Sequence, residues 1–568
     1  MTAEVVLGNQ TCMVKFSDQA HRRAYYPEDR RLYLWIDPRI ALGLLACIGV
    51  LLAAAWINRI VFGLPSIAIN EALDQGKFRG PHGFPGWIRW THFFNLLFIT
   101  MLIRSGLSIL ADHPRLYFND DCTPGTEWIR FTPLKIPVDK IWTSREDARY
   151  LSPLLGLPGY KHTVGMARSW HFLNVYGFIV TGFVFVIGLC STDQWLRLVP
   201  TSLTIVGEAW ATFVYYATFT LPPEPDGFYS YNALQQLSYF ATVFIMAPAS
   251  ILTGLAMSPA LVNRAPWFAK MFGGRQAARS IHFLVMAGFA GFIVIHVTLV
   301  VLTGFVRNMN HIVLGKDDLD PLGMWLGLTG IGVVILTWVI AHQVAWKQPR
   351  KVQHLHKAIA MPILKATLNR LDPVQSFSRD KISPRMWPNG NIPVREDWKL
   401  LSADRFKDFK LKITGLIENP VELPLREIKE LDRTETVMMH HCVQGWSGIA
   451  QWAGVSLAKI IEIVKPLPSA QTIVFYSFGE AFFGGPYYDT QSIQNALKPG
   501  SILAYEMNGK TLPEEYGAPL RLRLNNQLGY KMVKWIERIE FVESEKVVGK
   551  GEGGNNEDDG YFDLLPEI

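Results

Sequence analysis

The chain has 568 residues, a formal net charge of +6, 49% apolar residues and a mean hydropathy of +0.14. A chain of this length folds into several domains, because each domain of ordinary size buries its own core. The charge is small for the length, and the basic residues gather beside apolar stretches, which argues against nucleic-acid binding. Long apolar stretches before about residue 346 indicate a membrane protein.

Six stretches of roughly 20 or more mostly apolar residues fit the thickness of a bilayer as helices. The first of them is long and lacks a small-residue cleavage site, which indicates a retained anchor and not a signal peptide. A seventh candidate, residues 202–220, contains Glu208 and precedes a proline-rich run, so we expect it to lie at the membrane surface. The predicted spans are residues 39–62, 88–110, 165–191, 231–258, 278–306 and 322–346.

An even number of spans puts both ends of the chain on one side of the membrane. Lys and Arg are more frequent in the loops of that side, which by the positive-inside rule predicts a cytoplasmic location for both ends. Much of this excess lies in the single loop between the second and third spans, so the opposite orientation stays open.

From about residue 375 the pattern of apolar and polar residues becomes that of a soluble domain. Apolar, β-rich runs at 472–476, 501–505 and 536–542 alternate with Gly, Pro and Asn turns, and one helix is expected at 456–464. The Gly, Asn and acidic residues near the end predict disorder. The predicted organisation is an N-terminal segment (1–38), an all-α transmembrane helical bundle (39–346), a linker (347–379), an α+β, β-rich domain (380–545) and a disordered acidic tail (546–568).

Four histidines lie in the predicted spans, where an imidazole is costly unless it is paired or ligated. His92 and His171 each lie near the start of a span, and His282 and His296 share one span. Their separation of fourteen residues corresponds to about 21 Å of rise and leaves the two side chains within about 40° of one another. One helix therefore presents two imidazoles on one face, near opposite membrane surfaces.

A b-type haem takes two axial ligands, and neutral imidazole is a normal ligand of iron. The second and fifth spans run antiparallel, so we expect His92 at the depth of His296 and His171 at the depth of His282. These four residues therefore predict two haems stacked along the membrane normal. The alternative is that each histidine only bonds to a neighbouring helix.

Several short motifs accompany these histidines: Arg89-Trp90-Thr91-His92, Arg104-Ser105-Gly106-Leu107, Arg168-Ser169-Trp170-His171 and Leu252-Thr253-Gly254. With them, residues 85–315 resemble the cytochrome b561-type subunits of bacterial formate dehydrogenases, nickel-iron hydrogenases and thiosulfate reductases. The resemblance implies a bacterial inner membrane and electron exchange with quinone. That family usually begins its first histidine helix in the cytoplasm, which would place the soluble domain outside, against the charge count. The chain also departs from the family by an extra span at each end.

The soluble region contains one cysteine in a distinctive context. Cys442 lies in the run His440-His441-Cys442-Val443-Gln444-Gly445-Trp446-Ser447, and two further motifs follow at 517–521 and 529–535. A solitary cysteine is usually a small core residue. The three ordered motifs nevertheless resemble the sulfite oxidase superfamily of molybdopterin-binding domains, particularly the catalytic subunits of bacterial sulfoxide reductases, over about 380–545.

By position, the resemblance assigns Cys442 to molybdenum as the catalytic ligand, and Arg521 and Lys534 to the pterin or its phosphate. A thiolate is a soft ligand that suits molybdenum, and a phosphate favours cations and backbone amides. The alternative for the two cations is a solvated strand edge. The remaining candidates are Ser477 and the amides of Met532 and Val533 beside the pterin, and Asn389 and Asn391 either at the entry side of the pocket or in a simple turn.

The residues after Cys442 bear on the substrate. Sulfite-oxidising members carry arginines just after the ligand cysteine, whereas Val443-Gln444-Gly445-Trp446 follows here. The departure favours an uncharged, sulfoxide-like substrate over sulfite.

These observations predict a membrane-bound, molybdopterin-dependent oxidoreductase with two b-type haems and a molybdenum-molybdopterin cofactor. It would transfer an oxygen atom to or from a small molecule and exchange electrons with quinone or quinol in the surrounding lipid. The sequence is also compatible with a homo-oligomer. The alternative from another class is a transmembrane di-haem electron conduit whose soluble domain binds a ligand or partner without catalysis.

Overall fold

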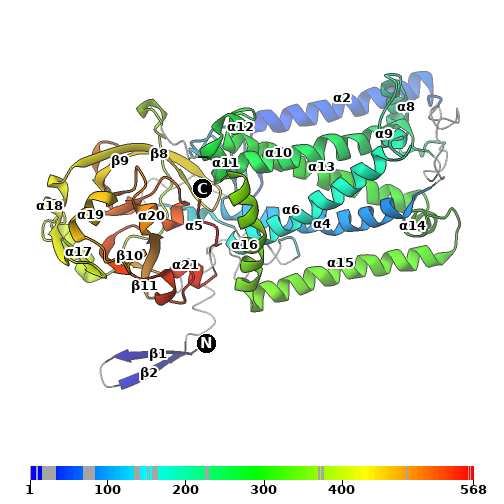
Figure 1. Ribbon diagram of the computed structural model, residues 1–568. Helices are drawn as coiled ribbons and strands as arrows, with labels where there is room; N and C mark the ends of the chain where they lie inside the picture. The colour runs from blue at the N-terminus through cyan, green and yellow to red at the C-terminus, as the bar shows by residue number, and fades with distance from the viewer. Residues whose placement is uncertain are drawn as a thin grey trace.

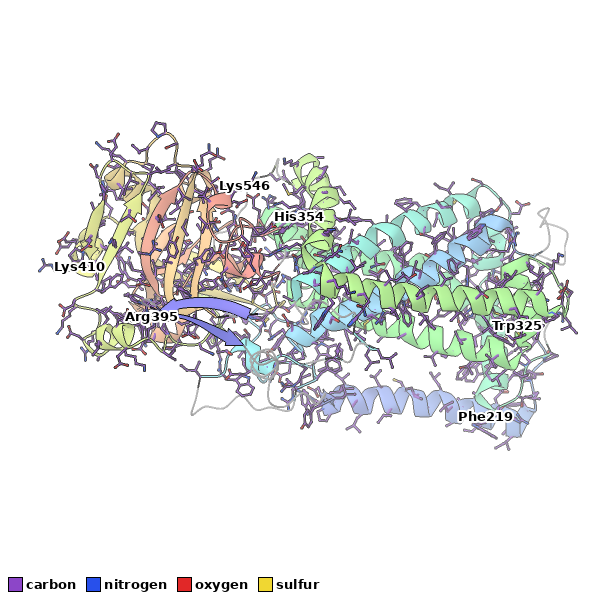
Figure 2. The ribbon with its side chains drawn as sticks, turned by 90° about the horizontal axis from the view of Figure 1, so that it is seen from below. Phe219, Trp325, His354, Arg395, Lys410 and Lys546 are labelled. Atoms are coloured by element: carbon purple, nitrogen blue, oxygen red, sulfur yellow. The ribbon has the colours of Figure 1, made fainter. Side chains whose placement is uncertain are left out.

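Two bodies lie side by side in a computed structural model of the chain: a bundle of long helices and a β-rich domain, with the C-terminus where they meet (Figure 1). In Figure 2, His354 lies between the soluble domain, which carries Lys410, and the bundle, whose far end carries Phe219 and Trp325. The structure describes residues 2–7, 10–15, 33–67, 83–132, 141–149, 151, 154–156, 164–223, 228, 230–368, 371, 377–481, 484–560, 562 and 564–568.

Six helices among the described residues are long and apolar enough to cross a membrane, which confirms the six predicted spans. A helix satisfies its own backbone groups, which a bilayer requires. Five spans are continuous α-helices, and the fourth contains a π-helix, η2. The spans are α2 (Pro38–Phe62), α4 (Gly86–Asp112), α6 (Val164–Cys190), α9-η2-α10 (Ala233–Phe240, Ala241–Met246, Ala247–Met257), α13 (Arg275–Leu302) and α15 (Pro321–Lys347).

The first and last spans begin with the same pair of residues, Asp followed by Pro. The Asp37 carboxylate accepts from the Arg39 amide over 2.9 Å, and the Asp320 carboxylate accepts from the Leu322 amide over 2.9 Å. Proline is suited to the first helical position, because its missing N–H has no partner there in any case. The local sequence thus fixes where these two spans start.

Shorter helices cover the ends of the bundle. Among them α8 (Ile205–Ala217) occupies the stretch that we expected at the membrane surface, and it is shorter than a span. The others are α5 (Ser144–Asp147), α7 (Trp195–Leu198), α11 (Pro259–Arg264), α12 (Pro266–Lys270) and α14 (Phe305–Leu314). Short strands also occur before the soluble domain: β1 (Thr2–Leu7), β2 (Gln10–Lys15), β3 (Trp35–Ile36), β4 (Arg115–Leu116) and β5 (Ile129–Arg130).

The predicted linker contains an amphipathic helix, α16 (Pro349–Ala366), which crosses the end of the bundle in Figure 1. One face buries Val352, Gln353, His356 and Ala360, which repeat every three to four residues. The opposite face exposes Leu355, Ile359 and Ile363. An apolar exposed face on a helix at the end of a bundle is typical of the boundary between lipid and water.

The soluble domain is α+β and β-rich, as predicted. Two sheets have the strand orders β11-β10-β15-β6-β7 and β13-β12-β9-β8, with β14 paired to β12. The strands are β6 (Lys410–Gly415), β7 (Val421–Pro424), β8 (Arg433–His441), β9 (Ser447–Ser456), β10 (Thr472–Glu480), β11 (Pro486–Ser492), β12 (Ile502–Met507), β13 (Lys510–Thr511), β14 (Arg521–Arg523) and β15 (Ile536–Val542). The helices are α17 (Glu396–Ala403), α18 (Leu425–Glu430), α19 (Leu457–Val464) and α20 (Ile493–Ala496).

One hydrophobic core fills this domain, and its largest fully buried side chains include Trp387, Trp446 and Trp452. The pairing of β9 with β12 brings two backbones very close together at Gly454. A Cβ at that position would lie 1.9 Å from the Leu503 carbonyl oxygen. Only glycine permits this approach, which holds β9, the strand that follows Cys442, in place.

The C-terminal segment differs from the expected disordered tail. Residues 546–560, 562 and 564–568 are described and include α21 (Asn555–Asp558), in which Glu557 is 2% exposed. The ammonium group of Lys531 binds Asp489 and lies 2.8 Å from the Glu557 carboxylate. Gln353 of α16 donates to the Phe562 carbonyl over 3.1 Å. The acidic composition suggested solvation, but these charges are instead paired inside the fold.

Replacing Lys531 by Met should destabilise the soluble domain by about 3 to 5 kcal/mol, because two buried carboxylates lose their cation. The exposed Lys550, which pairs with Asp559 at 2.8 Å, is the control, and its change to Met should cost well under about 1 kcal/mol. Thermal unfolding of the purified proteins measures both. Equal effects would show that the buried network does not hold the segment.

Candidate functional site

The structure brings the four span histidines together in two pairs. The rings of His92 and His296 have centroids 6.3 Å apart, and those of His171 and His282 have centroids 6.4 Å apart. These are the pairs that helix geometry predicts. Since α13 carries one member of each pair, the two pairs lie at two depths of the bundle, about 21 Å apart along that helix.

The ring separation fits a metal between the imidazoles. Metal–imidazole bonds of about 2 Å on each side, with each ring centroid about 1 Å behind its nitrogen, place the centroids about 6 Å apart. Two neutral rings at this distance with no group between them would gain little from each other. Each pair therefore suits one haem iron.

The hydrogen bonds of Ser105 favour one tautomer of His171. The Ser105 hydroxyl donates to the Met101 carbonyl over 2.8 Å, so it is available only as an acceptor to the His171 Nδ1, 2.9 Å away. The Nδ1 must then carry the proton, and the Nε2 keeps its lone pair for a metal.

Thr253 does the same for His282. Its hydroxyl donates to the Ala249 carbonyl over 2.6 Å and lies 3.0 Å from the His282 Nδ1, so the same argument makes it the acceptor there. Each hydroxyl residue is followed by a glycine, Gly106 or Gly254, where a Cβ would lie 3.6 or 3.7 Å from the Cε1 of the histidine. These two Ser/Thr-Gly pairs leave room around the imidazoles of α6 and α13.

The other pair has aromatic neighbours. The His296 ring stacks on Phe292 with centroids 5.5 Å apart and an interplanar angle of 7°. Tyr239 meets the same ring edge-on at 6.0 Å. The π-helix η2 begins two residues after Tyr239, and π-helical turns are frequent at functional sites.

The Cys442 turn, residues 442–447, connects β8 to β9. The Cys442 amide donates to the Trp446 carbonyl over 3.1 Å, and the Gly445 amide donates to the Cys442 carbonyl over 3.0 Å. Gly445 has a φ of +111°, which favours glycine. The Cys442 side chain is 3% exposed, and burial raises the pKa of its thiol to about 12. The thiol is thus a neutral buried group unless a cation converts it to a thiolate.

A cationic cluster lies beside this turn, formed by the buried Arg521 and Arg523 and the half-buried Lys534. Arg523 Nη1 lies 2.9 Å from the Nδ1 of His440, and both guanidinium groups lie over the Trp452 ring, at 5.0 and 4.4 Å. Burial lowers the pKa of Arg521 to about 10 and that of Lys534 well below its usual range. Within the described part of the chain, none of the three cations forms an ion pair with a carboxylate.

Several donors in and next to this cluster have no protein partner among the described residues: Arg521 Nε, Arg523 Nε and Nη2, and the indole nitrogens of Trp446 and Trp452. Buried donors without partners are costly, and buried cations without anions more so. An anionic group with many acceptors, such as a pterin phosphate, would satisfy them. The residues present therefore fit a molybdopterin next to a single sulfur ligand.

The other predicted contacts have mixed positions. The Ser477 hydroxyl donates to the Lys534 carbonyl over 2.7 Å, so it fixes the backbone of a cluster residue. The Met532 amide donates to the Gly529 carbonyl over 3.1 Å, and the Val533 carbonyl accepts from Leu522 over 2.8 Å.

Asn389 and Asn391 lie in the segment before α17. The Asn389 side chain accepts from the next amide, that of Gly390, over 3.0 Å, as in a turn, and Asn391 is exposed. Position 390 faces Trp535, the neighbour of Lys534. The segment before α17 therefore passes near the cationic cluster, and the contact of the Asn389 side chain is that of a turn.

Arg523 was missing from the sequence-based candidates. A signal was present, because residues two apart on a strand share a face and Arg521 and Arg523 are the ends of β14. The contribution of α13 to the surroundings of the Cys442 turn had no local signal, because it arises from residues about 170 positions away in the chain.

Fold and site define a two-part membrane protein, with paired histidines in the bundle and a lone buried cysteine beside a cationic pocket in the soluble domain. Residues 83–314 match the family model described as prokaryotic cytochrome b561, and residues 398–548 match the oxidoreductase molybdopterin binding domain. The chain is therefore a fusion of a cytochrome b561 domain with a molybdopterin-binding oxidoreductase domain.

Two curated relatives carry names that refer to sulfoxides. The chain is 32% identical over 153 residues to the putative protein-methionine-sulfoxide reductase subunit YedZ1 of Azospira oryzae, covering 27% of this chain and 54% of the relative. It is 31% identical over 192 residues to the protein-methionine-sulfoxide reductase catalytic subunit MsrP of Xanthomonas campestris, covering 31% and 56%. The chain thus spans about half the length of each.

A solved structure, the sulfane dehydrogenase SoxCD from Paracoccus pantotrophus, is 20% identical, with a TM-score of 0.22. The match covers 24% of this chain and 39% of that one. A likeness this low carries no argument about fold or activity.

Replacing Thr253 by Val should lower the affinity of the bundle for haem about tenfold, because the His282 Nδ1 loses its acceptor. The haem-to-protein ratio after purification measures it. Thr181, a buried threonine of α6 whose hydroxyl donates to the Gly177 carbonyl, is the control, and Thr181→Val should keep full haem. Equal haem content in both variants would contradict the role of Thr253.

Replacing Arg523 by Gln should lower the molybdenum content of the purified protein by about tenfold or more, because a charged hydrogen bond to the cofactor is lost. Metal analysis measures it. Arg433 of β8, which is 44% exposed and pairs with Glu506, is the control, and Arg433→Gln should keep its molybdenum. Full molybdenum in Arg523→Gln would place the cofactor elsewhere.

Proposed function

We propose that the chain is a quinone-coupled oxidoreductase that transfers an oxygen atom to or from a small uncharged molecule. The supporting observation is that one chain holds both kinds of site: two imidazole pairs with the separation of iron ligands, and a cysteine beside an anion-demanding pocket. The His171–His282 pair lies near the start of α13, the end that contacts the soluble domain. The soluble site therefore lies next to the nearer of the two pairs.

Two haems held by His92–His296 and His171–His282 would carry electrons one at a time across the bilayer. A molybdenum held by Cys442 and the cationic cluster supplies two-electron oxygen transfer when it is bound. For a sulfoxide, removal of the oxygen consumes two electrons and two protons and releases the sulfide and water. A quinol that becomes a quinone supplies two electrons and releases two protons, so the reaction balances.

The surroundings of Cys442 favour an uncharged substrate. Two arginines from α13 lie near the turn, but backbone carbonyls already occupy them. Arg275 donates to the carbonyls of Met257 and Gly445, and Arg279 to those of His113 and Arg115, over 2.7 to 3.0 Å. Neither guanidinium has to bind an oxyanion in order to be satisfied. The names of the two relatives point to sulfoxides as the first class to test.

We place the soluble domain on the cytoplasmic side of a bacterial inner membrane, following the excess of Lys and Arg in the loops of that side. The described residues include six candidate spans, which support a multi-pass protein. Protease protection in sealed vesicles tests the side, because only a domain outside the vesicle is cleaved.

The deciding experiment follows the haem spectrum of the quinol-reduced protein after addition of sulfoxides and N-oxides. We expect rapid haem oxidation by at least one of them, and none in Cys442→Ser, which should keep its haem. Cys190, an exposed free cysteine at the end of α6, is the control, and Cys190→Ser should behave as the wild type. Haem without molybdenum would support an electron conduit, and oxidation that survives in Cys442→Ser would contradict the assignment.

A further inference from the structure

The first turn of α13 is bonded directly to the Cys442 turn. Arg275 Nη1 donates to the Gly445 carbonyl over 3.0 Å, and Gln276 Nε2 donates to the same oxygen over 2.9 Å. Gln276 Nε2 also donates to the Ser447 hydroxyl over 3.0 Å. Arg275 is 5% exposed and Gln276 is fully buried. These bonds are therefore shielded from water. Hydrogen bonds are stronger in such a buried environment than in water.

Asp120, from the segment after α4, reinforces this contact. Its carboxylate accepts from the backbone N–H of Gln276 over 2.9 Å, and its backbone carbonyl accepts from the Ser447 hydroxyl over 3.1 Å. The Arg279 guanidinium also packs against the turn, 3.4 Å from where a Cβ of residue 445 would be. Residues of α13 and of the segment after α4 therefore bond to or contact the turn.

The same helix carries an imidazole of the nearer pair. His282 follows Arg275 by seven residues, which is about 10 Å along the axis and within about 20° of the same face. Arg275 Nε also donates to the Met257 carbonyl over 2.9 Å at the end of α10, the helix whose Thr253 accepts from His282. Arg275 therefore links the Cys442 turn to both helices that fix the His282 ring.

We propose that Arg275 and Gln276 form a clamp that holds the Cys442 turn and the His171–His282 pair in one fixed geometry for electron transfer. They are positioning residues, since they contact the turn and not the reacting atoms. The clamp makes transfer between the two domains a step within one rigid unit, with no docking event before each electron. This inference rests on the proposed function.

The test is Gln276→Leu, which removes both side-chain bonds of Gln276 at similar volume, in the purified full-length holoenzyme. We expect unchanged haem and molybdenum content and haem oxidation by the sulfoxide slowed about tenfold. Hydrogen exchange of the amides in 442–447 should become faster, a readout that does not depend on turnover. Turnover driven by a reduced viologen dye, which reaches the soluble domain directly, should stay within about twofold of wild type.

Gln236→Leu is the matched control. Gln236 is also buried and donates to the Leu196 carbonyl over 3.0 Å, and it lies on α9, toward the other end of the bundle. This variant should exchange the 442–447 amides and oxidise its haem at wild-type rates. If Gln276→Leu fails to assemble, Arg275→Lys, which keeps the charge and shortens the reach, is measured in the same way.

Wild-type exchange and wild-type haem oxidation in Gln276→Leu with full cofactors would overturn the clamp. A wild-type protein whose haem no sulfoxide or N-oxide oxidises would instead contradict the proposed function. In that case the hydrogen exchange of Gln276→Leu against Gln236→Leu still decides whether the clamp holds the turn.

Discussion

An imidazole inside a bilayer needs a partner for each ring nitrogen, and this requirement shapes the helical bundle. Ser105 and Thr253 satisfy one nitrogen of His171 and His282, and the facing ring lies at the distance that a bound iron needs for the other. The helices must therefore hold hydroxyl, imidazole and glycine at matching depths. The soluble domain applies the same requirement to charge, since Arg521 and Arg523 are buried beside the half-buried Lys534 and no carboxylate among its described residues pairs with these three cations.

The two sites depend on a shared frame. Helix α13 begins at the Cys442 turn and carries an imidazole of each pair, so its register sets the distances between all three positions. A helix suits that purpose, because each N–H bonds to the carbonyl four residues earlier and the rise per residue is constant. Centres on separate proteins would have to meet by diffusion before electrons could pass between them. Here one chain contains both domains, and its contacts are buried.

The sequence predicts the spans and histidine pairs well, because both follow from local periodicity: apolar length for the spans and a fourteen-residue spacing on one face for His282 and His296. Cys442, Arg521 and Lys534 are predicted from the order of three motifs and the family that these motifs resemble, because no periodicity or spacing singles the residues out. The C-terminal segment could not be predicted from composition, because its acidic residues are buried against Lys531. Likewise, no local pattern relates Gln276 to Gly445, which lie 169 residues apart and meet only through tertiary packing.

The four spans around the histidines form two closely packed helix pairs, α4 with α6 and α9-η2-α10 with α13, while α2 and α15 lie outside these pairs. Both histidine pairs take one ring from each helix pair, His92 and His171 from the first and His296 and His282 from the second. An iron bound at either level would therefore join the two helix pairs through its ligands. A haem held there would stabilise the packing of the bundle as well as carry electrons.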